Sequence, residues 1–385
     1  MEKEAGQSDD RPLRIAMVVP PWYEVPPPGY GGLEQVCAAL IDGLVARGHD
    51  VTLFGCGERT GTRARFVSTG PPQFRRLGEL LPELTHVARV NELLERGRFD
   101  VIHDHTMAGP LSALTRKAPT VLTMHGCPRG EQGEYFRHLD RRMGLVAISY
   151  SQRRLAPQLP WAAVVHHGIA AVESPRTEPG DGPVLWLARF CADKGPELAI
   201  AACREAGLPL VLAGKCNEEN EKRYLDEVVN PLLGPDVELV VNGDRQTTSE
   251  LLRRARCLIM PITWEEPFGM VMIEAMALGT PVVALNRGAV PEVVKHGRTG
   301  FVCERPEQLP DALRRVGLID PADCVAHVRD RFSPDLMARG YEQVYRWAIH
   351  RTPAVHRAAS GSGRTGLAVA GQKAEPLAGG GWPAA

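Results

Sequence analysis

Short runs of apolar residues alternate with longer amphipathic stretches along most of the chain. RIAMVV at residues 14–19 is typical of a buried strand, residues 33–48 follow a helical period that ends at Gly48, and DVTLFG at 50–55 predicts the next strand. Helical segments separate three further strand-like runs, at residues 100–105, 120–126 and 144–149. This alternation predicts parallel βαβ units.

A stretch that is poor in core residues, AAVESPRTEPGDGP at 170–183, reads as a linker before a second alternating series. The strands of that series are expected at residues 183–189, 208–214, 237–243, 257–262 and 281–285. A helix over 270–278 should stop at Gly279-Thr280-Pro281, and Ser333-Pro334-Asp335 is typical of the start of a last helix. The pattern predicts two open α/β domains of similar size, with the carboxyl ends of their strands facing a shared cleft.

Composition narrows the possible functions. The 385 residues carry a net charge of −1, which does not favour nucleic acid as a partner. The nine cysteines form no C-x-x-C pair, a pattern that favours a reducing compartment over a disulfide framework. No signal-like segment and no run of 18 apolar residues occurs, so we expect a soluble, cytoplasmic protein.

Two glutamates stand eight residues apart in EPFGMVMIE (266–274), on either side of a glycine that precedes the predicted helix. Glu266 is expected in the loop before the helix, and Glu274 about a turn inside it. The free N–H groups of a helix N-terminus favour an anion, so the stretch suits a ligand with a negative group and several hydroxyls. A solvated loop residue and a helix-surface residue would give the same spacing, which is therefore weak evidence by itself.

Other motifs contain charged side chains, or glycines that allow the backbone to approach a ligand closely. LARFCADKG (187–195) places two cations, Arg189 and Lys194, after a predicted strand, where they can neutralise a pyrophosphate without a metal. The glycine-rich PPGYGGLEQ (27–35) opens a helix, but Glu34 stands where a dinucleotide-binding fingerprint requires Gly or Ala. Five histidines end strands, and no D-x-D sequence accompanies them, so no metal site is expected (His103, His105, His125, His166 and His167).

The segment TWEEPFGMVMIEAMALGTPVVALNRGAVPEVVKHGRTGFV resembles the signature of the retaining glycosyltransferases of family four. These enzymes have the GT-B fold, in which two Rossmann-like parallel-sheet domains face a central cleft. The resemblance extends to LARFCADKG, to the Gly31-Gly32 loop, to TMHG around His125 and to NGDRQTTSELL (242–252), and it covers roughly residues 14–350. A helix in the last segment is expected to be capped at Thr248 or Ser249.

The resemblance implies a role for each matching residue. Glu266, His125, Arg189 and Lys194 would be catalytic. Glu266 would hold sugar hydroxyls, and Glu274 would accept hydrogen bonds from the ribose hydroxyls. The implied donor-binding residues are Gly31, Gly32, Arg189, Lys194, Arg245, Phe268, Gly269, Met270, Val271 and Glu274.

Some positions depart from the family pattern or lie outside it. His167 and Ala170 in VVHHGIA stand where the family has Asn and Asp. Ser149 and Ser151 match an S-x-S sequence to which we give a structural role. Exposed aromatic residues in the glycine-rich region can stack on an acceptor or cover the surface (Trp22, Tyr23 and Tyr30).

The expected organisation is a disordered N-terminus (1–10), an acceptor-side Rossmann-like domain (11–170) and a donor-binding one (171–332). A C-terminal helix (333–350) that returns to the first domain and a disordered tail (351–385) follow. The expected reaction is metal-independent, retaining transfer from a nucleoside-diphosphate sugar, with UDP favoured, to a hydroxyl of a small-molecule acceptor, such as a secondary metabolite. No cofactor is expected.

Three alternatives remain open. A lipid or polysaccharide glycosyltransferase at the membrane surface would use a basic and aromatic patch (Arg63, Arg65, Phe66, Phe74, Arg75 and Arg76), which also suits a weak membrane contact. A UDP-sugar epimerase shares the fold, and a nucleotide-sugar-binding protein would lack turnover. The sequence does not specify the donor sugar, the acceptor or the oligomeric state.

Overall fold

The computed structural model describes residues 11–29, 31–139 and 142–351, and these belong to one compact unit. The segment predicted as a loose N-terminus (1–10) and Tyr30 lie outside the described residues. The same holds for the predicted tail apart from Arg351, which is still helical.

The first half of the chain builds a seven-stranded parallel sheet in the order β3-β2-β1-β4-β5-β6-β7. Its strands are β1 (Arg14–Val18), β2 (Asp50–Gly55), β3 (Arg65–Ser68), β4 (Val101–Asp104), β5 (Thr120–Met124), β6 (Gly144–Ala147) and β7 (Trp161–Val164). The central strand β1 places Ile15 beside Val51 of β2 and Val101 of β4. All three side chains are buried, as expected for a parallel sheet that is covered on both faces.

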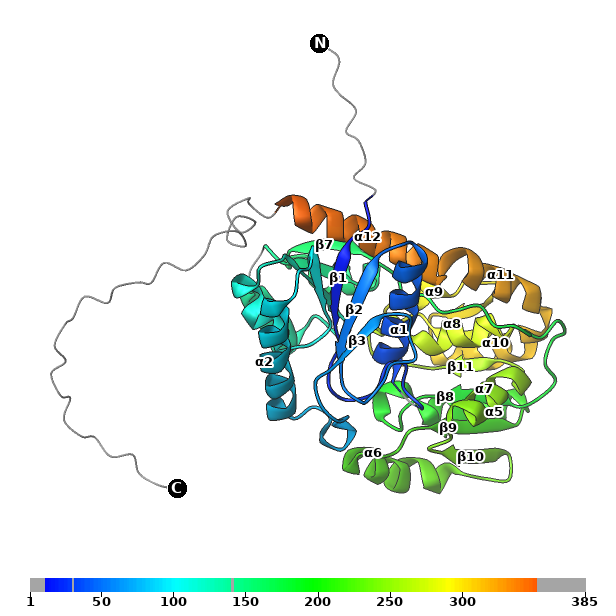
Figure 1. Cartoon of the computed structure of the whole chain (residues 1–385). Helices are drawn as coiled ribbons and strands as arrows, with labels where there is room; N and C mark the ends of the chain where they lie inside the picture. Colours follow the sequence, from blue (N-terminus) through cyan, green and yellow to red (C-terminus); the bar gives the residue numbers. More distant parts are fainter. Residues whose placement is uncertain (1–10, 30, 140–141, 352–385) are drawn as a thin grey trace, which may run out of the picture. The chain divides into compact units, whose positions relative to one another are not determined.

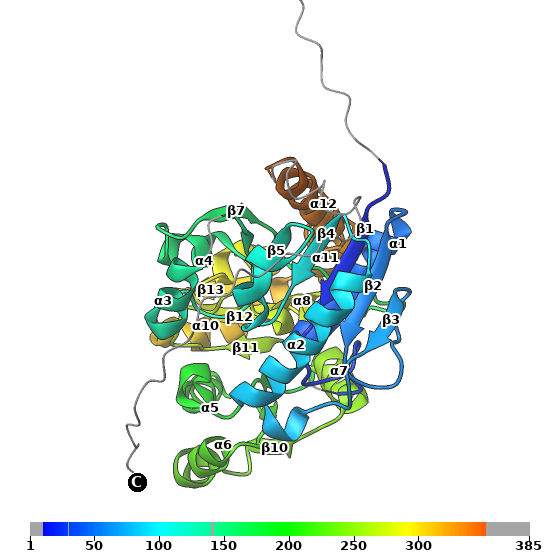
Figure 2. The ribbon, with the colours of Figure 1, turned by 60° about the vertical axis from the view of Figure 1, so that its left-hand side comes forward.

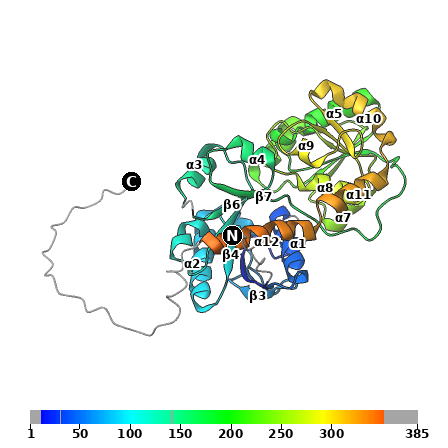
Figure 3. The ribbon, with the colours of Figure 1, turned by 90° about the horizontal axis from the view of Figure 1, so that it is seen from above.

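Helices cover both faces of this sheet (Figure 3). The helical segments are α1 (Gly32–Ala46), η1 (Phe74–Arg76), α2 (Leu80–Arg96), η2 (Gly109–Thr115), α3 (Gly130–His138) and α4 (Tyr150–Leu155). On one face α1 buries Leu40 and Leu44, and on the other α2 buries Val90 and Leu94 against separate hydrophobic clusters. The i, i+4 spacing of each pair presents one apolar stripe to the sheet.

The second half builds a six-stranded parallel sheet in the order β10-β9-β8-β11-β12-β13. Its strands are β8 (Val184–Leu187), β9 (Leu210–Gly214), β10 (Val237–Val241), β11 (Leu258–Met260), β12 (Val282–Leu285) and β13 (Gly300–Cys303). Its larger helices are α5 (Pro196–Ala206), α7 (Arg245–Arg254), α8 (Met270–Ala277), α10 (Leu309–Arg315) and α11 (Pro321–Arg331). Helix α5 contacts α10, and α8 contacts α7 and α11, so two helix layers enclose the sheet (Figures 2 and 3). The predicted pair of parallel-sheet domains is confirmed.

Shorter helical segments complete the second half. They are η3 (Ala192–Lys194), α6 (Glu219–Tyr224), a π-helical turn η4 (Leu225–Val229), η5 (Asn230–Leu232), α9 (Val290–Val293), η6 (Pro306–Gln308) and η7 (Val316–Leu318). The segment η3 lies in the loop after β8, and α9 follows β12, so both belong to loops at the carboxyl ends of central strands.

The last helix, α12 (Pro334–Arg351), packs against elements of the first half (Figure 1). It contacts α1, and its Tyr341 and Tyr345 are buried in the same hydrophobic cluster as Ile15 and Leu40. Its start after Ser333 was predicted from the sequence. The predicted domain boundaries at 170/171 and 332/333 stay predictions, because all the described residues form one unit.

One local prediction is wrong. Helix α7 begins at Arg245, and the carboxylate of Asp244 caps it by accepting from the N–H of Thr247 at 2.8 Å. The predicted caps, Thr248 and Ser249, lie inside the helix, where the Thr248 hydroxyl donates to the Asp244 carbonyl. Asp ranks above Thr as an N-cap residue, and it comes first along the chain.

Candidate active site

In each sheet the strand order reverses beside the first strand, between β1 and β4 and between β8 and β11. Such a reversal is called a topological switch point. Open α/β sheets bind ligands there, at the carboxyl ends of the strands. In the second sheet, Arg189 and Lys194 follow β8, while Glu266 follows β11. The fold therefore brings to one switch point three residues that the sequence reading singled out.

Lys194 and Glu266 form an ion pair at this point. The Lys194 ammonium donates to Oε2 of Glu266 at 2.5 Å, and the indole N–H of Trp264 donates to the same oxygen at 3.0 Å. The ammonium also lies 4.7 Å from the centre of the Trp264 ring. Among the described residues, no hydrogen bond uses Oε1 of Glu266, which leaves that oxygen to accept from a ligand.

The loop after β12 holds the backbone of Glu266 in place. The Ala289 N–H donates to the Glu266 carbonyl at 2.8 Å, and the Gly288 N–H donates to the side chain of Glu265 at 2.8 Å. Gly288 has φ 58°, and a Cβ at this position would lie 2.2 Å from the Glu266 carbonyl oxygen. Only glycine combines this backbone conformation with so close an approach. Sequence reasoning missed Trp264, Glu265 and Gly288 as supports of Glu266.

Arg189 lies in the same loop as Lys194. Its guanidinium forms an ion pair with Glu221 at 3.5 Å, and Glu221 also accepts the N–H groups of Asn217 and Glu218. Burial raises the pKa of the Cys191 thiol, while the positive charges of Arg189 and Lys194 oppose that rise. The charges of Arg189 and Lys194 thus both reach Cys191, in the short loop that contains them. A diphosphate site requires two positive charges that lie close together in this way.

Helix α8 begins directly after the loop that follows β11 and carries Glu266. Its N-cap, Gly269, has φ 82°, a left-handed conformation that favours glycine, and Met270 opens the helix. The Phe268 ring is buried against His167 and Phe332, with ring centres 5.0 and 5.9 Å away. The predicted contribution of Phe268 to donor binding therefore falls to its backbone N–H.

Glu274 is a half-buried carboxylate in α8 that lacks a strong partner. Burial raises its pKa, and the charge of Arg245 in α7 opposes this shift. Within the described parts of the chain, no hydrogen bond or ion pair engages its carboxylate. The structure thus brings Arg245 and Glu274, both predicted as donor-binding, into one electrostatic neighbourhood. A carboxylate held this way favours a ligand that donates hydrogen bonds.

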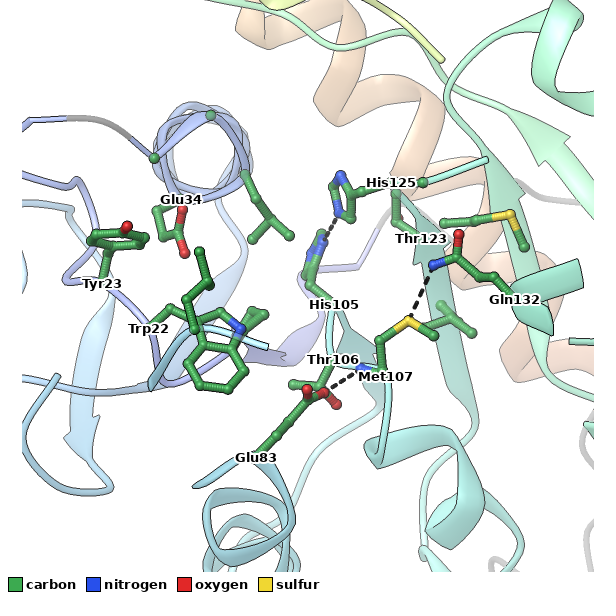
Figure 4. A pocket seen from close by; sticks show the side chains of 18 of the residues that line it. Trp22, Tyr23, Glu34, Glu83, His105, Thr106, Met107, Thr123, His125 and Gln132 are labelled. Carbon is green, nitrogen blue, oxygen red and sulfur yellow. Dashed lines mark hydrogen bonds between the residues drawn. The ribbon is translucent and has the colours of Figure 1, made fainter. Parts of the chain in front are cut away.

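A cavity of about 370 Å³ opens at the switch point of the first sheet (Figure 4). Its lining comes from the loops after β1, β4 and β5 and from the starts of α1 and α3, and it includes Gly31, Gly32 and His125. Figure 4 shows Trp22, Tyr23 and Glu34 on one side and His105, His125 and Gln132 on the other. This size and this mixture of apolar walls with a few polar groups are typical of a small-molecule site.

Glu34 is a buried acid in this wall. Burial raises its pKa from 4.5 to about 7, against the opposing effects of its own backbone N–H and of the Lys215 charge. In the sequence, Glu34 served only to exclude a dinucleotide fingerprint. Its burial and altered pKa make it a functional candidate, because such shifts gather at ligand sites.

His125 is held by a second histidine, His105. The Nε2 of His105 lies 3.2 Å from the thioether sulfur of Met17, which can only accept, so this nitrogen carries the proton. Burial lowers the pKa values of both histidines, that of His125 to about 4, so both are neutral at pH 7. Nδ1 of His105 therefore accepts from Nε2–H of His125 at 2.9 Å, and Nδ1 of His125 becomes a hydrogen-bond acceptor.

A row of neighbouring aromatic rings runs from His125 through His167 to Phe268, just before α8. The His167 ring stacks at 5.4 Å on His125 and lies 5.0 Å from Phe268. His167 occupies the position where the family has Asn, and its buried Nδ1 lacks a hydrogen-bond partner among the described residues. Ser149 caps α4 by accepting from the Gln152 N–H, which confirms its structural role.

Glu292 of α9 joins the two halves of the chain. It accepts the backbone N–H groups of Tyr150 and Ser151 at 2.8 and 2.6 Å and lies 3.0 Å from Nε2 of His166. Burial alone would raise the pKa of Glu292, but these hydrogen bonds outweigh burial and lower it. The sequence reading did not identify this contact.

Two features of the described residues bear on the alternatives. Within residues 11–29, 31–139 and 142–351, no group of three or more His, Cys, Asp or Glu side chains could hold a metal ion. In the same residues, none of the helices has the length and the apolar content that crossing a bilayer requires. In the predicted basic patch, Arg63 bonds Asp42 and Arg76 pairs with Glu79, while Arg75 lies over the Phe74 ring.

Comparisons with known families agree with this geometry. The model "Glycosyltransferase Family 4" matches residues 30–171, and "Glycosyl transferases group 1" matches residues 173–321. The two matches lie in the two halves of the chain, and β1 (Arg14–Val18) precedes the first of them. The chain belongs to the family-four glycosyltransferases, with the GT-B fold.

Relatives of this glycosyltransferase have diverse names. A glycogen synthase of Mycobacterium tuberculosis is 28% identical over 80% of this chain and 87% of its own length. Among solved structures, AviGT4, a glycosyltransferase involved in avilamycin A biosynthesis, is 24% identical with a TM-score of 0.68, covering 88% of this chain and 98% of its own. The Anabaena protein HepE, in complex with UDP and glucose, is 18% identical with a TM-score of 0.66, over 87% and 100%. Both structures support the fold.

Proposed function

We propose that this glycosyltransferase moves a sugar, with retention of configuration and without a metal ion, from a nucleoside-diphosphate sugar to a hydroxyl of a small-molecule acceptor. UDP is the nucleotide that we expect, and the HepE complex with UDP and glucose supports this choice. The observation that carries the proposal is the Lys194–Glu266 pair at the switch point of the second sheet, beside the N-terminus of α8.

On this proposal the donor diphosphate binds to Lys194, Arg189 and the N–H groups at the start of α8. These groups stabilise the charge that develops as the bond between the sugar and the diphosphate breaks. Glu266 accepts from a sugar hydroxyl through Oε1, and the neutral His125 accepts from another through Nδ1. Glu274 binds the ribose hydroxyls, which supply the donors that its carboxylate lacks.

The acceptor site is the cavity at the first sheet, because Gly31, Gly32 and His125 line it and are also expected beside the donor. Retention follows when the acceptor hydroxyl attacks on the face that the diphosphate leaves. The new glycosidic bond forms there, and an oxygen of the departing diphosphate takes the hydroxyl proton. Positioning and electrostatic stabilisation then supply the catalysis.

A donor screen tests the proposal. Free nucleotide release is measured with several UDP- and GDP-sugars, with and without acceptors, for the wild type, for Glu266→Gln and for the exposed control Glu95→Gln. We expect release from a UDP-sugar by the wild type and the control, with a strong loss in Glu266→Gln. Conversion of the donor into another UDP-sugar without UDP release would indicate an epimerase. Nucleotide binding without any turnover would indicate a binding protein.

A further inference from the structure

We infer that the acceptor is an uncharged amphiphile: a hydroxyl-bearing head group without phosphate or carboxylate occupies the cavity, and an attached apolar portion lies on the exposed surface at its rim. This rests on the proposed function, because it takes the cavity as the acceptor site. It adds the chemical class of the acceptor, which the family resemblance does not specify.

The charges of the cavity disfavour an anionic head group. None of the lining residues in the described chain is Lys or Arg, whereas two, Glu34 and Glu83, are acids. Glu83 accepts the N–H groups of Met107 and Ala108 at 2.5 and 3.1 Å, so these donors at the start of η2 are already used. A phosphate monoester brings almost two negative charges and binds to cations or to free N–H groups. The lining offers it carboxylates instead.

The nearby cation Lys215 is engaged elsewhere. Its ammonium donates to the Tyr23 hydroxyl at 2.8 Å and lies 5.3 Å from the centre of the Tyr23 ring. Tyr23 lines the cavity, and Lys215 does not. The ammonium thus holds the Tyr23 ring by a hydrogen bond and a cation–π contact, so Lys215 fixes an aromatic wall of the cavity.

Polar side chains of the lining suit a hydroxyl-bearing head group. Glu34 and Gln132 line the cavity and can exchange hydrogen bonds with hydroxyls. The Gln132 amide N–H points to the thioether of Met107 at 3.5 Å, a weak acceptor that a hydroxyl oxygen can replace. Trp22 adds a flat apolar wall on which a sugar ring or a cyclitol can lie.

The rim of the cavity continues into an exposed apolar surface. Leu77 and Met107 line the cavity, yet they are 43% and 40% exposed. Leu80 and Leu81 in the first turn of α2 are 70% and 66% exposed, and Glu83 ties this turn to Met107 at the start of η2. We call the exposed side chains of this region the apolar rim (Leu77, Leu80, Leu81, Met107, Leu111 and Leu114).

Continuity with the cavity identifies what covers the apolar rim. Isolated apolar side chains on a surface need no explanation, but a cluster that adjoins a ligand site marks a binding surface. Helix α2 contacts η2, Glu83 of α2 accepts from the Met107 N–H, and Leu77 and Met107 belong to both the rim and the cavity. A molecule whose head group occupies the cavity would therefore place its attached apolar part on the rim.

Three matched probes test this inference: octyl β-glucoside below its micelle concentration, methyl β-glucoside and glucose 6-phosphate. Binding is measured by calorimetry at about pH 8, where Glu34 is mostly ionised, and by acceptor-dependent UDP release. We expect the octyl glycoside to bind about tenfold more tightly than the methyl glycoside, because several methylenes are covered. Glucose 6-phosphate should bind about tenfold more weakly than the methyl glycoside, because its charge meets carboxylates.

Variants assign these differences to the two surfaces. Leu80→Ser combined with Leu81→Ser should remove the octyl advantage and leave methyl glucoside binding unchanged, because neither leucine lines the cavity. Leu318→Ser, at a leucine that is 78% exposed in the second half of the chain, is the matched control and should change neither. Gln132→Lys should improve binding of glucose 6-phosphate, whereas Gln132→Met should not.

Several results would overturn the inference. Glucose 6-phosphate binding as well as methyl glucoside contradicts the charge argument, most directly if Lys215→Gln then abolishes that binding. Equal binding of the octyl and methyl glycosides contradicts the role of the apolar rim, and failure of all three probes to bind contradicts the assignment of the cavity. UDP binding and UDP release are separate readouts, so loss of these, with the probes still bound, contradicts the proposed function instead.

A membrane lipid and a free amphiphile share this chemistry, and a further measurement separates them. Neutral phosphatidylcholine vesicles are sedimented with the wild type and with the Leu80→Ser, Leu81→Ser variant. Co-sedimentation of the wild type alone identifies a lipid as the source of the acceptor. Equal recovery of both proteins in the supernatant identifies a free amphiphile.

Discussion

Replacing Glu34 by Gln should stabilise the protein at alkaline pH and should have little effect on stability in acid. Glu34 is buried, with its pKa raised from 4.5 to about 7. Because the folded state holds this proton more tightly than the unfolded state, Glu34 favours unfolding increasingly as the pH rises through the interval between these values. Gln carries no proton to lose, so it removes this pH dependence.

The expected gain in stability follows from the size of the pKa shift of Glu34. A separation of about 2.5 pKa units, at about 1.4 kcal/mol per unit, gives about 3 kcal/mol near pH 8 and almost nothing near pH 4. With an unfolding entropy of about 2.1 cal/mol/K per residue over roughly 340 residues, this corresponds to about 4 °C in Tm.

Thermal unfolding across pH measures the difference in Tm between Glu34→Gln and the wild type. Buried neutral histidines such as His103 and His105 have lowered pKa values, so they destabilise both proteins as the pH falls. Comparing the variant with the wild type at each pH removes this shared effect. The exposed Glu95→Gln variant should track the wild type throughout. A difference in Tm that stays constant from about pH 4 to about pH 8 would refute the raised pKa.

Four further outcomes are expected. Glu274→Gln should weaken UDP binding about tenfold or more in calorimetry, because a charge-assisted hydrogen bond contributes about 1.5–3 kcal/mol. Glu266→Gln should instead leave UDP affinity nearly unchanged and lower kcat. EDTA should not affect turnover; loss of turnover that Mn²⁺ or Mg²⁺ restores would contradict metal independence. Glu292→Gln should lower Tm, because a carboxylate that accepts two backbone N–H groups is lost, and an unchanged Tm would show that the contact contributes little. A chain that ends at Arg351 should keep its activity, as initial rates beside the full chain will show.

The sequence carried enough signal for the central strands and the helices beside them. Runs such as RIAMVV and PVVAL are apolar at every position because both faces of a parallel sheet are covered. Strands β3, β7 and β13 were missed; all three are edge strands, and β3 and β7 are partly exposed. A short edge strand combines polar and apolar residues as a loop does, so its pairing depends on the neighbouring strand.

Motif resemblance located the donor-side residues, but it could not give their contacts. Lys194 and Glu266 are 72 positions apart, and their ion pair exists because β8 and β11 are neighbours in the sheet. Lys215 and Tyr23 lie 192 positions apart, in loops that follow strands of different sheets, and no local pattern relates them. The sequence shows an acid at position 34 but not that it is buried. Its burial depends on the cavity wall that the loop with Trp22 and Tyr23 helps to form.

Four buried or half-buried glutamates of this glycosyltransferase fall into two physical groups, and the difference identifies those that await a ligand. Glu221 and Glu292 accept backbone N–H groups and cationic or imidazole partners, so the folded chain itself supplies partners for their carboxylates. Burial raises the pKa values of Glu34 and Glu274 instead, and the chain leaves that cost largely uncompensated. A ligand that donates hydroxyl hydrogen bonds would relieve it at each site: the acceptor at Glu34 and the ribose of the donor at Glu274. Two carboxylates that destabilise the free protein are thus expected to become stabilising contacts when both substrates are bound.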